Sequence, residues 1–144
     1  MRKGFTLIEM LIVIMVIAIL IGIALPRFRG MQEEGNVAKA KGELVTLQAA
    51  VESYYLHNSN AYPAALTNLT TANPNIIGTT LPTDPFNGAN NYGYAQSPNG
   101  QYYVIYSVGP QGNGSAAVAN TGVITETNGT SCIYVSNAGR DTQP

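Results

Sequence analysis

The sequence has few of the residues on which enzyme and metal sites depend. Its 144 residues include one cysteine, Cys132, one histidine, His57, and no tryptophan. A single cysteine excludes an intrachain disulfide and a cysteine-based zinc site. The lone histidine leaves little for a metal cluster or a histidine-dependent triad. No acid–base pair, nucleophile with a partner or phosphate loop is recognisable, so we expect no catalysis.

Charge is also scarce. Only 10% of residues are charged, with 7 Lys and Arg against 8 Asp and Glu, and the formal net charge is −1. A nucleic-acid-binding protein usually carries a basic field, so we predict no nucleic-acid partner. The length suggests one domain. Hydrophobic residues make up 45% of the chain, but they are unevenly distributed.

The apolar residues are concentrated in Phe5–Leu25, where only Thr6 and Glu9 are polar. As a helix this segment is about 31 Å long, close to the thickness of the bilayer hydrocarbon, and it has no polar face. We predict a transmembrane helix. A secretory signal peptide cut after Ala24 is disfavoured because the run exceeds the usual apolar length of about 7–15 residues. An ordinary single-pass membrane anchor does not explain why a carboxylate, Glu9, lies near the start of the apolar run.

The N-terminal residues MRKGFTLIE, followed by the apolar run, resemble the class III leader of type IV pilins and type II secretion pseudopilins. The resemblance implies that prepilin peptidase cuts after Gly4 and methylates the new N-terminus at Phe5. Pro26 matches another landmark of these proteins. We therefore divide the chain into a leader peptide (1–4), a transmembrane and filament-core helix (5–26) and a periplasmic head (27–144).

Glu9 is the predicted assembly residue, together with Pro26. A carboxylate within an apolar span costs roughly 2.5–3.5 kcal/mol on insertion scales for a mid-helix acid, so it is normally paired or functional. Cleavage after Gly4 creates a charged amine at Phe5. In a stack of parallel helices, Glu9 of one subunit can pair with that amine of a neighbour. The alternative is that Glu9 lies at the membrane interface and merely reaches water.

Helical periodicity resumes after Pro26. Apolar residues recur at spacings of three and four, which predicts an amphipathic helix over about 31–57 that ends near His57–Asn60. Gly22 and Pro26 predict a kink between the two helical parts. The apolar stripe consists of Val37, Ala40, Leu44, Leu47, Val51 and Tyr54.

The remaining residues predict a small sheet over about 92–136. We expect a short helical turn near Ala64–Thr70 and strands at Tyr92–Tyr94 and Gln101–Val108. Val123–Thr127 and Ser131–Ser136, joined by Asn128-Gly129, predict a hairpin. The predicted fold class is α+β, with a long N-terminal helix packed on an antiparallel sheet of three to four strands.

Two segments of the head are similar to the major pseudopilin of type II secretion, the G subunit. They are LPTDPFNG at Leu81–Gly88, followed by Asn91–Tyr94, and YSVG at Tyr106–Gly109. That subunit typically binds calcium in the acidic loop that follows the second segment. Here Pro110–Ala117 contains no carboxylate, which calcium usually requires. We expect no cofactor, unless the fold brings Glu126 and Asp141 to this loop.

The resemblance implies a structural subunit of a type II secretion pseudopilus, assembled by an ATPase-driven machine. Its implied partners are copies of itself, minor pseudopilins or pilins, prepilin peptidase, the inner-membrane assembly platform and membrane lipid. The alternatives are a surface type IV pilin for adhesion, motility or DNA uptake and a plain membrane-anchored binding domain. The resemblance places the head in the periplasm, whereas the basic residues that follow the span favour the opposite orientation.

Overall fold

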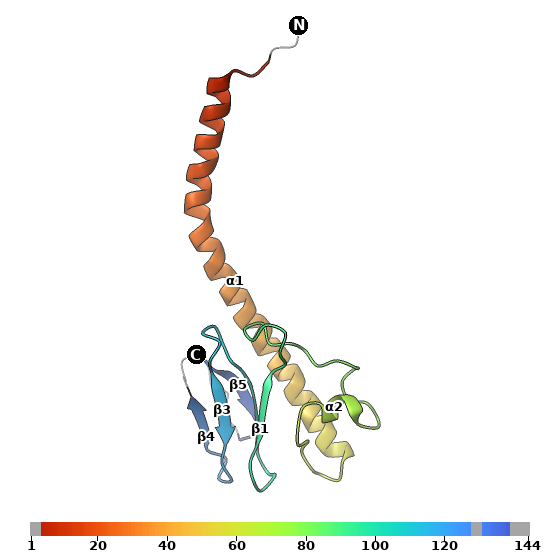
Figure 1. Cartoon of the computed structure of the whole chain (residues 1–144). Helices are drawn as coiled ribbons and strands as arrows, with labels where there is room; N and C mark the ends of the chain where they lie inside the picture. The colour runs from red at the N-terminus through yellow and green to blue at the C-terminus, as the bar shows by residue number, and fades with distance from the viewer. Residues whose placement is uncertain (1–3, 128–130, 139–144) are drawn as a thin grey trace. The chain divides into compact units, whose positions relative to one another are not determined.

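One long helix, α1 (Leu7–His57), dominates the N-terminal part of the computed structural model, which describes residues 4–127 and 131–138 (Figure 1). The two predicted helical parts form one helix of 51 residues that continues through Pro26. Because Pro26 has no N–H, it cannot donate to the Gly22 carbonyl four residues earlier. The Gly22 carbonyl therefore lacks its helical donor, but the helix does not end there, and the kink stays a prediction.

The chain forms two units, Met1–Gly35 and Asn36–Pro144. In the first unit, the apolar side chains from Phe5 to Leu25 are exposed around the whole helix. Among the described residues, α1 is the one helix long and apolar enough to cross a membrane. A helix that is apolar on every side needs lipid or other helices around it.

The second unit contains five strands in the described part of the chain. Three form an antiparallel sheet in the order β1-β2-β5, and two form a separate antiparallel ribbon. The sheet strands are β1 (Gly93–Gln96), β2 (Tyr103–Ser107) and β5 (Ile133–Ser136); the ribbon strands are β3 (Ser115–Val118) and β4 (Ile124–Thr127).

The three-stranded sheet is covered on both faces. On β2, Tyr103 and Ile105 pack with the buried stripe of α1, whereas Val104 packs with Ala116 and Val118 of the ribbon. This alternation follows from the two-residue period of a strand. The head therefore has three layers: helix, sheet and ribbon. The predicted stripe is confirmed, with Ala40, Leu44, Leu47 and Val51 buried and Val37 and Tyr54 partly buried.

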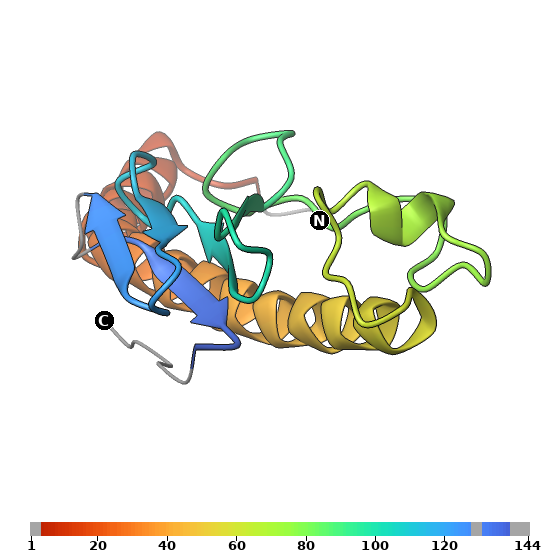
Figure 2. The same cartoon turned by 90° about the horizontal axis from the view of Figure 1, so that it is seen from below.

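The connection between α1 and β1 adds to the same core. The short helix α2 (Asn68–Thr71) overlaps the predicted turn and lies beside the C-terminal part of α1 (Figure 2). Leu66 and Leu69 belong to the cluster that the stripe forms. The predicted end of α1 is confirmed at His57. Ser59 and Asn60 adopt positive φ angles of 54° and 56°, a conformation that terminates a helix.

The α+β class is confirmed, but the predicted hairpin is wrong. β4 pairs with β3 and β5 pairs with β2, so the two strands expected to pair belong to different sheets. The predicted turn, Asn128-Gly129, lies outside the described residues. β3 was not predicted, because its residues, Ser-Ala-Ala-Val, include only one β-branched side chain.

Tyrosines join the helix to the sheet through two glutamates of α1. The Tyr103 hydroxyl donates to Glu52 Oε1 at 2.7 Å, and the Tyr92 hydroxyl donates to Glu43 Oε2 at 2.6 Å. Tyr62 lies against Tyr103, with ring centroids 4.8 Å apart. Buried phenols with carboxylate acceptors pack as hydrophobic groups and satisfy their hydroxyls at the same time.

Replacing Leu47 by alanine should destabilise the head. Leu47 is fully buried in the core, so Leu47→Ala should lower the free energy of unfolding by about 2–5 kcal/mol. Val45→Ala is the matched control, because Val45 lies on the same helix and is 59% exposed. Chemical denaturation of the full chain in detergent measures both changes. Equal effects of the two substitutions would contradict the assigned helix face.

Stability should fall in alkaline solution. Burial, followed by the hydrogen-bonded glutamates, raises the pKa of Tyr92 and Tyr103 above the ordinary 10.0. The folded state therefore holds these protons more tightly than the unfolded state. The contribution of these two tyrosines to the free energy of unfolding should be constant below about pH 10 and decrease above it, by about 1.4 kcal/mol per pH unit for each tyrosine. Denaturation of wild type and Tyr103→Phe across this range tests it, and a flat wild-type profile would contradict it.

Candidate assembly site

The predicted site residues near the N-terminus surround the start of α1. Thr6 directly precedes Leu7, the first helical residue, and Glu9 lies three positions after Thr6. The Thr6 N–H and the Thr6 hydroxyl both donate to Glu9 Oε2, each at 2.8 Å. The Glu9 N–H points back to Thr6 Oγ1 at 3.3 Å. These reciprocal contacts are a capping box, which fixes the start of the helix at this sequence.

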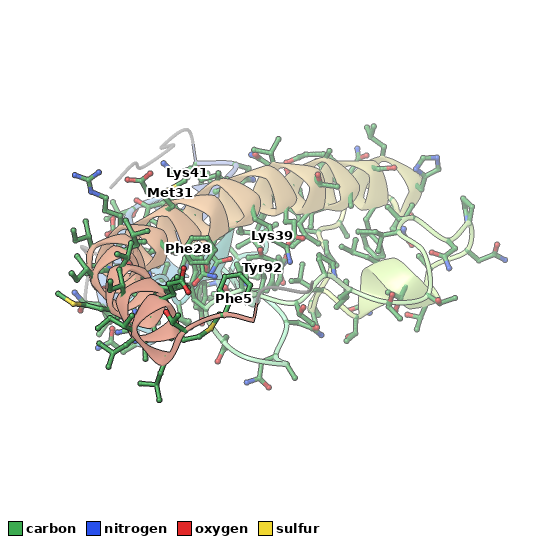
Figure 3. All side chains as sticks on the ribbon, turned by 90° about the horizontal axis from the view of Figure 1, so that it is seen from above. Phe5, Phe28, Met31, Lys39, Lys41 and Tyr92 are labelled. Atoms are coloured by element: carbon green, nitrogen blue, oxygen red, sulfur yellow. The ribbon has the colours of Figure 1, made fainter. Side chains whose placement is uncertain are left out.

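The Gly4–Phe5 peptide bond lies before the helix begins. Residues 4–6 have no regular secondary structure, and Gly4 and Phe5 are exposed. Figure 3 shows Phe5 on the segment that leads into α1. A peptide bond outside a helix presents its backbone to a peptidase, because its N–H and C=O groups are not committed to helical hydrogen bonds.

Glu9 stands on an apolar surface. Its neighbours Leu7, Ile8 and Met10 are 83%, 62% and 47% exposed, and none of them carries charge. The carboxylate is the acidic group of the segment from Phe5 to Leu25. Such a group attracts a cation strongly once lipid or neighbouring helices exclude water.

Pro26 lies apart from the other predicted site residues. Seventeen positions separate Glu9 from Pro26 within α1, which corresponds to about 26 Å along the helix axis. The structure therefore brings Thr6 and Glu9 together but does not bring Pro26 to them. Beyond Pro26 the exposed surface of α1 carries further apolar side chains, including Phe28 and Met31 (Figure 3).

A second polar cluster lies in the head, around the buried carboxylate of Asp84. Asp84 is 1% exposed, and its Oδ1 accepts hydrogen bonds from the Phe86 N–H at 3.0 Å and the Ser107 hydroxyl at 2.8 Å. Its Oδ2 accepts from the Val108 N–H at 2.9 Å. Asp84 thus joins the loop before β1 to the end of β2. Gly109 follows with φ +70°, where a Cβ atom would collide with the Ser131 carbonyl.

Within the described residues, the loop that connects β2 to β3 carries no carboxylate of its own. Both Asp84 oxygens accept hydrogen bonds from the protein, and Glu126 Oε1 accepts one from the Tyr134 hydroxyl at 2.9 Å. Within residues 4–127 and 131–138, no three acidic, histidine or cysteine side chains gather as metal ligands. Asp141 lies outside the described residues. The expectation that the chain needs no cofactor stays a prediction.

Cys132 is 2% exposed and packs between the sheet and the ribbon. Burial, with a smaller effect of the charges on Glu126 and Asp84, raises the pKa of its thiol to about 12. The thiol is therefore protonated at neutral pH, and a protonated buried thiol is a poor nucleophile. These observations support the interpretation of Cys132 as a small hydrophobic core residue.

The apolar helix with its leader motif and the α+β head define a class: pilin-like proteins with an N-terminal methylation signal. The model of the prokaryotic N-terminal methylation motif matches residues 1–25, and that of type II secretion system (T2SS), protein G, matches residues 27–126. The chain belongs to the protein G family of the type II secretion system. This membership confirms the resemblance to the major pseudopilin and does not favour the surface-pilin alternative.

Curated relatives agree with this assignment. The chain is 32% identical to type II secretion system core protein G of Pseudomonas aeruginosa over 124 residues, covering 77% of this chain and 85% of the relative. It is 31% identical to the proteins of the same name from Klebsiella pneumoniae and Escherichia coli K12, again over 77% of this chain and over 86% and 83% of theirs. No solved structure is a significant match.

Removing the charge of Asp84 should destabilise the head. In Asp84→Asn, an amide NH₂ replaces one of the two accepting oxygens, so one buried donor loses its acceptor. We expect the free energy of unfolding to fall by about 1–3 kcal/mol. Glu126→Gln is the control, because Glu126 is exposed and its replacement still accepts a hydrogen bond from Tyr134. Thermal denaturation compares the two variants, and a wild-type melting temperature for Asp84→Asn would contradict the assigned role.

Proposed function

We propose that this chain is cleaved between Gly4 and Phe5, methylated at Phe5 and assembled through α1 into a type II secretion pseudopilus. The observation that carries the proposal is the methylation motif over residues 1–25 joined to an apolar helix that is exposed on every side. A helix of this kind is stable in lipid before assembly and against identical helices after it. The role is structural, as the family assignment indicates.

Glu9 sets the axial position of each subunit in this proposal. Cleavage converts the Phe5 nitrogen into a charged amine, and Glu9 of one subunit accepts a hydrogen bond from the amine of its neighbour. Charge-assisted hydrogen bonds are roughly twice as strong as neutral ones, and exclusion of water strengthens them further. Dispersion contacts between apolar helices are similar for many axial positions of one helix along the other. The pair of Glu9 with the neighbour's Phe5 amine forms at only one axial position and therefore favours it.

Before assembly, the subunit spans the inner membrane with its head in the periplasm. Arg27 and Arg29 directly follow the apolar segment, where anionic lipid headgroups attract basic side chains. The partners in the proposal are copies of this chain, minor pseudopilins, prepilin peptidase and the inner-membrane assembly platform.

Glu9→Ala should uncouple membrane insertion from assembly. The alanine variant keeps the apolar helix, so it should insert as wild type does, but it lacks the acceptor for the neighbour's amine. We expect filament formation to fall at least tenfold, the effect of about 1.4 kcal/mol per contact. Electron microscopy and sedimentation of filaments measure assembly, and membrane fractionation measures insertion.

Glu33→Ala is the matched control, because Glu33 is an exposed acid of the same helix outside the apolar segment. It should assemble nearly as wild type does. Mass spectrometry of the mature N-terminus tests processing in the same samples, and we expect a methylated Phe5 as the first residue. A chain that begins at Leu25, or normal filaments from Glu9→Ala, would overturn the proposal.

A further inference from the structure

Thr6 was not among the predicted site residues, yet within the described part of the chain it donates both hydrogen bonds that the Glu9 carboxylate accepts and also accepts one from the Glu9 N–H. We propose that Thr6 is a positioning residue for assembly: it holds the Glu9 carboxylate in the orientation that receives the neighbour's amine. This inference rests on the proposed function and adds to it the residue that prepares Glu9 before two subunits meet.

The geometry assigns different tasks to the two carboxylate oxygens. Both Thr6 donors converge on Glu9 Oε2. Within the described ranges, 4–127 and 131–138, no hydrogen bond to Glu9 Oε1 is observed, and the side chain is exposed. Capping of the helix and pairing with a neighbour therefore use separate oxygens. The subunit does not have to break its cap in order to assemble.

The cap survives processing. Cleavage after Gly4 removes residues on the N-terminal side of Phe5, whereas the Thr6 N–H belongs to the next peptide bond. Both donors to Oε2 thus remain in the mature chain. Glu9 Oε2 in turn satisfies the Thr6 N–H, which has no partner within the helix. An unsatisfied N–H is especially unfavourable in lipid, so the membrane strengthens the preference for this arrangement.

Fixing the carboxylate in advance lowers the entropy that is lost when subunits join. A free glutamate side chain samples many rotamers, and each immobilised side chain weakens association. In Thr6→Ala the hydroxyl is absent, so Glu9 Oε2 keeps only the backbone N–H donor and the Glu9 N–H loses its acceptor. Loss of such an N-cap side chain typically shifts a helix-start equilibrium about fivefold. We expect filament yield at limiting subunit concentration to fall by about the same factor.

Three substitutions separate capping from charge pairing. Thr6→Ser keeps a capping hydroxyl and should assemble as wild type does. Glu9→Gln keeps an acceptor for the cap but has no charge, because Gln also completes a capping box. It should preserve the helix start and fail to assemble. Thr6→Ala should lose the helix start, retain the charge and assemble about fivefold less.

Amide hydrogen exchange of the full mature chain in lipid nanodiscs reads the helix start directly. Slow exchange of the N–H groups at positions 6 and 9 is expected for wild type, Thr6→Ser and Glu9→Gln. Thr6→Ala should speed exchange at position 9, whose acceptor is the Thr6 hydroxyl, and Glu9→Ala should speed exchange at position 6, whose acceptor is the Glu9 carboxylate. N-terminal mass confirms that every variant is processed at Phe5. The exchange measurement requires no filament, so it remains informative for variants that do not assemble.

Two results would overturn the inference. One is wild-type assembly of Thr6→Ala; the other is slow exchange at Thr6 that persists in Glu9→Ala. Failure of the proposed function has a different signature, namely normal filaments from Glu9→Gln or absence of filaments from wild type. A reduced yield of Thr6→Ala that Thr6→Ser does not restore would also contradict the role of the hydroxyl.

Discussion

The structure depends on one electrostatic constraint: a carboxylate must be accommodated on a helix that is otherwise apolar. Glu9 is costly in lipid when it has no partner, and the first partners that the chain supplies are the N–H and hydroxyl of Thr6. In the proposed assembly, the amine that processing creates at Phe5 is a better partner. A group that is tolerable in the monomer and favourable in the filament then gives the proposed assembly its direction and its register.

The head is stabilised differently, because its hydrophobic core contains no residue of the apolar segment Phe5–Leu25. The buried stripe of α1 covers one face of the sheet, and the β3-β4 ribbon covers the other. The tyrosine–glutamate hydrogen bonds and the Asp84 cluster then fix the loops to this core. The same helix thus provides an anchor at one end and a core element at the other, as its change of hydrophobic pattern after Pro26 requires.

The features that local pattern encodes were predictable from the sequence. The period of the apolar stripe indicated the buried face of α1. The TLIE pattern at Thr6–Glu9 was not predicted to be a capping box, although Thr followed three positions later by Glu is the signature of one. Features that depend on distant residues were not. The Asp84 carboxylate accepts hydrogen bonds from Ser107 and Val108, which lie more than twenty positions away in the sequence. The pairing of β4 depends on β3, whose small residues give a weak strand signal.

The most direct test of the account is a filament structure, determined by electron cryomicroscopy at a resolution that shows side chains. We expect Glu9 Oε1 within about 3 Å of the methylated Phe5 nitrogen of a neighbouring subunit, with Oε2 still accepting hydrogen bonds from Thr6 of its own chain. A filament in which the Phe5 amine binds another group, or in which Glu9 contacts no neighbouring amine, would contradict it.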